Sequence, residues 1–103
     1  MIENKQSISL IKANKQISMF CPLGNDYYTA NIHIKFVPND YYMDYIDLDV
    51  FLNKMGGMKL TIEEAVDMIY IELQRYAPLK TNVTIEAHSN THLKVTVSKG
   101  DDI

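Results

Sequence analysis

The segment Tyr28-Thr29-Ala30-Asn31-Ile32-His33-Ile34-Lys35-Phe36-Val37 decides the fold class of this chain. Apolar side chains occupy every second position from Tyr28 to Phe36, and polar side chains occupy the positions between them. A period of two places the apolar side chains on one face of a strand and the polar ones on the other. The segment therefore predicts a strand in a sheet with one buried face. Pro38-Asn39-Asp40 ends this strand.

The residues before this strand predict a shorter strand, a candidate partner for it and a loop. Residues 7–12 alternate weakly between polar and apolar side chains, and residues 16–20 are a candidate partner for them. Pro22 and Gly24 favour turns, so we expect a loop over residues 21–26.

Two helices are predicted in the middle of the chain. The first covers residues 47–55, with Asp44 or Asp47 as its cap and Gly56 or Gly57 as its stop. Before the second helix, Thr61 and Glu64 have the spacing of a capping box. Apolar residues then recur on one helical face, and Pro78 closes the region. These residues are Ile62, Ala65, Val66, Ile69, Leu73 and Tyr76.

The C-terminal part predicts a hairpin. Residues 83–87 and 93–97 each alternate between apolar and polar side chains, and the polar residues 88–91 link them. The expected order is thus strand–strand–helix–helix–strand–strand. It predicts an α+β fold in which two helices cover one face of a four-stranded antiparallel sheet.

Length and composition limit the classes of function. A chain of 103 residues has room for one domain, which we assign to residues 1–103. The net charge is −3 and the ten basic residues are scattered, so we expect no nucleic-acid partner. No apolar run reaches the roughly 18 residues of a membrane span. The polar start of the chain and its single cysteine favour a reducing compartment, the cytoplasm.

Three residues are candidates for a site. Cys21 ends a predicted strand beside a Pro- and Gly-containing loop, which favours an accessible thiol over a small apolar core residue. Asp26 is near enough in sequence to exchange a proton with Cys21, although an aspartate there also suits a turn. Glu63 begins the second helix and is either a ligand-binding carboxylate or a partner of the helix dipole. His33, His88 and His92 lack metal-site spacing, so we expect no metal.

A family resemblance joins these features. Phe20-Cys21-Pro22, followed by Ala30-Asn31-Ile32-His33-Ile34-Lys35-Phe36-Val37-Pro38, resembles the nitrile reductases of queuosine biosynthesis, which belong to the tunnelling-fold superfamily. In that family a strand leads to Cys-Pro, and a second strand alternates up to a proline. Ile62-Glu63-Glu64 is similar to the family's His-Glu-Asp at the start of the long helix.

The resemblance implies a mechanism and an assembly. Cys21 would add to the nitrile of a cyano-deazaguanine to form a thioimide, Asp26 would protonate the nitrogen, and Glu63 would bind the edge of the deazapurine. NADPH would then supply hydride, making the protein an oxidoreductase. The resemblance also implies a homo-oligomer with pockets between subunits.

The sequence departs from the family at two places. The family's aspartate, seven residues after the cysteine, is replaced by Tyr28. The family's lysine-containing segment is replaced by residues 44–49, which carry three aspartates. Acidic side chains repel the phosphates of NADPH, so we expect weak or absent NADPH binding.

Three functions therefore remain open. The first is a nitrile reductase-like enzyme, or a relative in which an amine replaces hydride. The second is a non-catalytic tunnelling-fold oligomer that binds a purine- or pterin-like ligand. The third is an unrelated α+β domain.

Overall fold

The computed structural model describes residues 1–88 and 93–103. Its elements are β1 (Ile2–Glu3), β2 (Ile11–Cys21), β3 (Asp26–Val37), β4 (Tyr41–Tyr42), α1 (Tyr45–Met55), α2 (Ile62–Gln74), β5 (Lys80–His88) and β6 (Val95–Gly100). The predicted hairpin link beyond His88 and the residue His92 lie outside the described residues.

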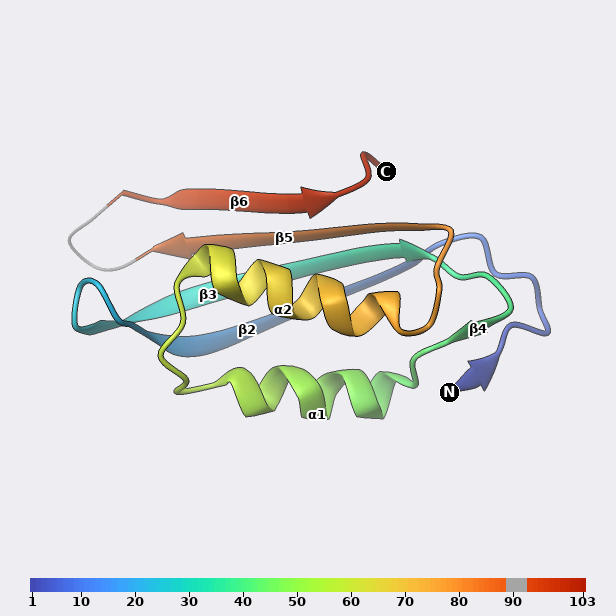
Figure 1. Ribbon diagram of the computed structural model, residues 1–103, viewed down its shortest axis with the longest axis horizontal. Helices are drawn as coiled ribbons and strands as arrows, with labels where there is room; N and C mark the ends of the chain where they lie inside the picture. Colours follow the sequence, from blue (N-terminus) through green and yellow to red (C-terminus); the bar gives the residue numbers. More distant parts are fainter. Residues whose placement is uncertain (89–92) are drawn as a thin grey trace.

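The main sheet has four antiparallel strands in the order β2-β3-β5-β6. Both helices lie on one face of this sheet, as Figure 1 shows. The predicted α+β architecture is therefore confirmed, and the four strands of this sheet and the two helices follow the predicted order. The short pair β1–β4, which joins Ile2 to Tyr42 and Glu3 to Tyr41, was not predicted.

The two strands predicted before Cys21 are in fact one, and this is a correction. β2 pairs with β3 along its whole length, from Ile11 opposite Phe36 to Cys21 opposite Asp26. Residues 7–10 precede β2 and are exposed. Lys15 interrupts the apolar pattern on the helix-facing side of β2, and for this reason the sequence predicted two segments instead of one strand. The Lys15 ammonium group pairs with Asp49 of α1. The predicted loop 21–26 shortens to a turn, because Cys21 and Asp26 are paired strand residues.

The core lies between the sheet and the helices. All five apolar positions predicted for the inner face of β3 are buried: Tyr28, Ala30, Ile32, Ile34 and Phe36. Opposite them, α2 buries Ala65, Val66, Ile69 and Leu73, and α1 buries Leu48, Leu52 and Met55. The helical and strand periods read from the sequence therefore meet in one hydrophobic core.

The predicted helix starts are present. Asp44 caps α1 by accepting a hydrogen bond from the backbone N–H of Ile46 at 2.9 Å. Thr61 and Glu64 form the predicted capping box, since each side chain accepts a hydrogen bond from the other residue's backbone N–H, at 3.2 and 3.1 Å. This box fixes the direction in which α2 leaves the linker, and so the place of Glu63.

The linker between the helices is attached to the outer edge of β2. Backbone hydrogen bonds join Gly57 N–H to the Ser18 carbonyl (2.9 Å), Phe20 N–H to the Met58 carbonyl (3.0 Å) and Leu60 N–H to the Phe20 carbonyl (3.1 Å). These bonds bring the start of α2 beside the end of β2. Among the residues that the structure describes, no helix is long and apolar enough to cross a membrane.

Candidate functional site

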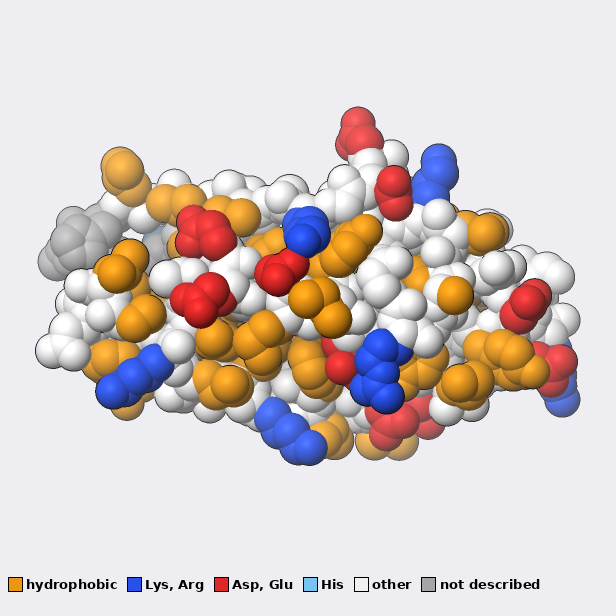
Figure 2. Space-filling view, viewed as in Figure 1, with side chains coloured by type: hydrophobic (Ala, Val, Ile, Leu, Met, Phe, Trp, Pro, Cys, Tyr) orange, Lys and Arg blue, Asp and Glu red, His pale blue; other side chains and the backbone are white. Residues whose placement is uncertain are grey.

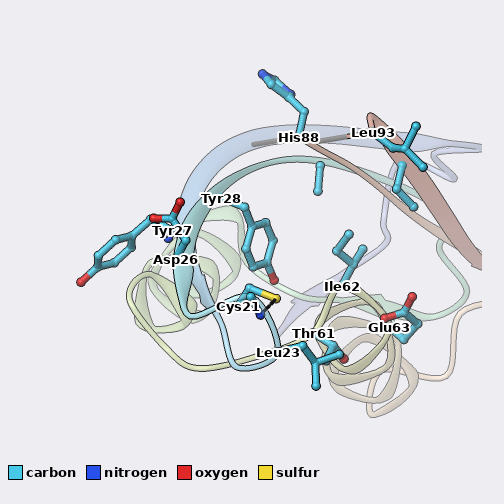
Figure 3. A pocket seen from close by; sticks show the side chains of 13 residues that line it. Cys21, Leu23, Asp26, Tyr27, Tyr28, Thr61, Ile62, Glu63, His88 and Leu93 are labelled. Atoms are coloured by element: carbon cyan, nitrogen blue, oxygen red, sulfur yellow. Dashed lines mark hydrogen bonds between the residues drawn. The ribbon is translucent and has the colours of Figure 1, made fainter. Parts of the chain in front are cut away.

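A pocket of about 280 Å³ lies where β2 turns into β3. The end of β2 and the turn contribute Cys21 and Leu23, and the start of α2 contributes Thr61, Ile62 and Glu63. Tyr28 of β3, together with Ala87 and Val95 from β5 and β6, completes most of its wall. Figure 3 shows these side chains around one hollow. The site thus gathers residues that are far apart in the sequence.

Cys21 is the last residue of β2 and is partly buried. Its sulfur accepts a hydrogen bond from the Gly24 N–H at 3.4 Å, and its carbonyl accepts one from the Asn25 N–H at 3.0 Å. Asn25 has a φ of +52°, which asparagine tolerates better than most residues. The tight turn therefore holds the thiol at the pocket wall (Figure 3).

The two predicted carboxylates lie differently around this thiol. Asp26 is exposed, and its Oδ1 accepts a hydrogen bond from the Tyr27 N–H at 2.7 Å. Its side chain lies on the outer side of the turn, away from the Cys21 sulfur (Figure 3). Glu63 lies in the first turn of α2 and lines the same pocket as Cys21. Within the described part of the chain, its carboxylate has no hydrogen-bonding or ion-pair partner and is available to a ligand.

Tyr28, which stands at the position of the family's aspartate, also lines the pocket, although the sequence analysis assigned it no role there. Only 8% of it is exposed, and its hydroxyl donates a hydrogen bond to the Leu60 carbonyl at 2.7 Å. In Figure 3 the hydroxyl points toward the Cys21 sulfur. Burial, and then the negative charges of Cys21 and Glu63, raise the pKa of Tyr28 to about 12. The phenol is therefore neutral near pH 7. Its apolar-face position in β3 indicated a core residue only.

Neither of the two described histidines, His33 and His88, projects into the pocket. His88 lines the rim of the pocket, but its ring points away from the hollow (Figure 3). His33 lies on the polar face of the sheet, where Nδ1 is 2.7 Å from the Asn14 side-chain oxygen and Nε2 is 3.5 Å from Glu86. Among the described residues, no three potential ligands gather into a metal site.

The rim of the pocket is apolar and open. Leu23 is 86% exposed and Leu93 is 82% exposed, and both line it. Figure 2 shows hydrophobic side chains at this end of the molecule and across its helical face. Exposed leucines at the rim of a pocket are available for contact with a ligand or another subunit.

The described part of the pocket is acidic rather than basic. Its described lining contains the carboxylates of Asp26 and Glu63 and no lysine or arginine to bind phosphates. Two aspartates of the segment expected to contact the cofactor already have partners within the chain: Asp44 caps α1 and Asp49 pairs with Lys15. The start of this segment also lies at the opposite end of the molecule from the β2–β3 turn, whose residues line the pocket (Figure 1).

Comparisons with known proteins give the fold. No protein-family model matches the chain. No curated protein matches it in sequence either. Among solved structures, the chain is similar to the archaeosine synthase QueF-Like in its apo form, with a TM-score of 0.84 and 15% sequence identity. The match covers 91% of this chain and 94% of that chain. The chain therefore has the tunnelling fold that the sequence resemblance predicted.

Proposed function

We propose that this chain is a tunnelling-fold enzyme in which Cys21 adds to the nitrile carbon of a cyano-substituted deazapurine. One observation carries the proposal: Cys21 and Glu63, from different elements, line one pocket. These are the nucleophile and the ring-binding carboxylate that the family resemblance implies. The fold shared with an archaeosine synthase supports the same class of substrate.

The dimensions and polarity of the pocket support a flat heterocycle. A volume of about 280 Å³ is near the lower end of small-molecule pockets. Ile62, Ala87 and Val95 give apolar contacts for the ring faces. The Glu63 carboxylate accepts hydrogen bonds from the N–H groups at the ring edge, and the sulfur of Cys21 attacks the nitrile to form a thioimide.

We propose an amine, rather than hydride, as the second reactant, because the residues present do not fit NADPH. The amine nitrogen attacks the thioimide carbon, the carbon–sulfur bond breaks, and the sulfur leaves as the thiolate of Cys21. The amine loses one proton to solvent, and the product is an amidine. This choice keeps the thioimide and removes the need for a reductant.

A binding protein without catalysis is the second candidate function. The acidic groups at the pocket, Asp26 and Glu63, do not stabilise a thiolate, and no cationic side chain lines the described pocket. A purine- or pterin-like ring would then bind through Glu63 and the apolar wall alone.

The distinguishing experiment is intact-mass analysis after incubation with cyano-deazaguanine. We expect a covalent adduct that is lost in Cys21→Ala. Glu63→Gln should weaken apparent binding roughly 10- to 100-fold, since a hydrogen bond to a charged group contributes about 1.5–3 kcal/mol. Asp102→Asn, an exposed carboxylate outside the pocket, is the matched control. Binding without an adduct would favour the second candidate, and an adduct in Cys21→Ala would exclude Cys21 as the nucleophile.

We also propose a homo-oligomer whose subunits meet around the pocket. The exposed leucines at its rim, Leu23 and Leu93, leave apolar surface for a neighbour to cover. β6 pairs with β5 on one side only within the described residues. Edge strands of this kind are commonly paired between subunits.

A further inference from the structure

Tyr28 is the only described pocket residue that carries a buried hydroxyl group. We infer that the Tyr28 hydroxyl is the proton donor to the nitrile nitrogen when Cys21 adds to a nitrile. The inference rests on the proposed function and deepens it, because it assigns the acid of the same site.

The geometry favours Tyr28 over Asp26. β2 and β3 pair so that Tyr28 lies opposite Met19. This pair is two residues along each strand from the Cys21–Asp26 pair and is therefore on the same face of the sheet. From there the Tyr28 ring stands in the pocket and its hydroxyl points toward the sulfur (Figure 3). The Asp26 carboxylate instead accepts the Tyr27 N–H and faces solvent.

A hydrogen bond fixes the Tyr28 hydroxyl at this place. It donates to the Leu60 carbonyl at 2.7 Å, and Leu60 itself is bound through its N–H to the Phe20 carbonyl of β2. The donor is thus held between the strand that ends at Cys21 and the linker that leads to α2. Rotation about the bond between the ring and the hydroxyl oxygen redirects the proton from Leu60 to a bound ligand without moving the ring.

The proton transfer balances without another reactant. The sulfur–carbon bond forms as one π bond of the nitrile breaks and its electron pair moves to nitrogen. The hydroxyl proton of Tyr28 passes to that nitrogen, and the thiol proton of Cys21 passes to the tyrosine oxygen. The products are a neutral thioimide and a neutral tyrosine, so the site never holds a buried phenolate.

A protonated phenol at Tyr28 fits this relay. With its pKa at about 12, as at the ordinary value of 10, the phenol is protonated near pH 7, so a proton is present to be donated. A nitrile nitrogen that has accepted an electron pair is far more basic than a phenolate, and the transfer is therefore downhill. General acids of this kind typically contribute about 10²- to 10⁴-fold in rate.

The test compares two reactions of the same thiol. The Tyr28→Phe variant keeps the ring and removes only the hydroxyl, and Tyr70→Phe, which alters a partly buried tyrosine outside the pocket, is the matched control. The rate of adduct formation with cyano-deazaguanine is followed by rapid quench and intact mass. The rate of alkylation by iodoacetamide, which needs no proton delivered to nitrogen, is followed in parallel.

We expect Tyr28→Phe to slow nitrile addition by about 100-fold or more, while alkylation and the Tyr70→Phe rates stay within about twofold. An equal fall in the rates of both reactions would show that Tyr28 has a structural role. An unchanged rate of nitrile addition would show that its hydroxyl has no role in this step. Either result overturns the inference while leaving the proposed function intact. A larger loss in Asp26→Asn than in Tyr28→Phe also overturns it.

A measurement on the unaltered protein completes the test. Nitrile addition should be slower in deuterated water, because a proton moves in the step, and iodoacetamide alkylation should show a smaller change. Equal solvent effects on the two reactions would contradict a proton donor. An absent adduct in the unaltered protein would overturn the proposed function and this inference together.

Discussion

Gly100, at the end of β6, allows a quantitative test of how closely the backbones of β6 and β5 approach each other. Its φ is +109°, and a Cβ at this position would lie 2.1 Å from the Thr81 carbonyl oxygen. Gly57 also has a positive φ, +78°, but a Cβ there meets no atom within 4 Å. The substitutions Gly100→Ala and Gly57→Ala therefore share the backbone strain and differ in the steric contact.

The expected magnitudes follow from the local hydrogen bonds. Backbone strain alone costs about 1–2 kcal/mol, and this is the loss expected for Gly57→Ala. In Gly100→Ala the Thr81 carbonyl must also move, and it accepts a hydrogen bond from the Asp101 N–H at 2.7 Å. Two neighbouring bonds join Asp101 to the Thr81 N–H (3.0 Å) and to the Asn82 amide (2.9 Å). At about 1 kcal/mol each, their loss makes Gly100→Ala roughly 3 kcal/mol less stable than Gly57→Ala.

Urea unfolding followed by circular dichroism measures this difference. All variants are compared at one protein concentration, because subunit association would otherwise change the apparent stability. With an m-value of about 1.5 kcal/mol per molar urea, the midpoint of Gly100→Ala should fall about 2 M below that of Gly57→Ala. Midpoints that agree within about 0.5 M would refute the steric argument.

Three further predictions concern the site and the assembly. Light scattering at micromolar concentration should show an oligomer, and a monomer would contradict the proposed contacts around the pocket. Calorimetry should show weak or absent NADPH binding, since Asp44, Asp47 and Asp49 occupy the expected cofactor segment; a micromolar dissociation constant would restore the reductase assignment. Because the pKa of Tyr28 rises from its ordinary value of 10 to about 12 on folding, its contribution to stability is present below pH 10 and is lost as the pH rises toward 12. The alkaline loss of stability should therefore be smaller in Tyr28→Phe, as pH-dependent urea unfolding can show.

The parts of the fold with strong local patterns were predictable from the sequence. β3 alternates over its length, and α2 combines a capping box with a full apolar face. The pattern of β2 is weaker because Lys15 occupies a position facing the helices, and its stabilising partner Asp49 is distant in sequence. The pair β1–β4 has two residues in each strand, which is too short to give a periodic signal.

The site was predictable only in part. Cys21 and Glu63 were selected from local features and the resemblance, and the structure brings both to one pocket. The orientation of Asp26 depends on a hydrogen bond to its own neighbour, which spacing does not reveal. The alternation of β3 placed Tyr28 in the core. The orientation of its hydroxyl depends on the Leu60 carbonyl, which is distant in sequence. The acidic roles of Asp26 and the binding role of Glu63 stay predictions.

The bonds between the helix linker and β2 determine how much of that strand another chain can use. The carbonyl of Ser18 and both outward backbone groups of Phe20 are already bonded to residues 57–60. By the alternation of an antiparallel strand, the outward groups that remain are those of Lys12, Asn14 and Gln16 and the N–H of Ser18. A strand added to this edge must therefore stop at Ser18, short of Cys21. Two sheets joined here are offset along the strand direction, and the linker of each chain sets that offset.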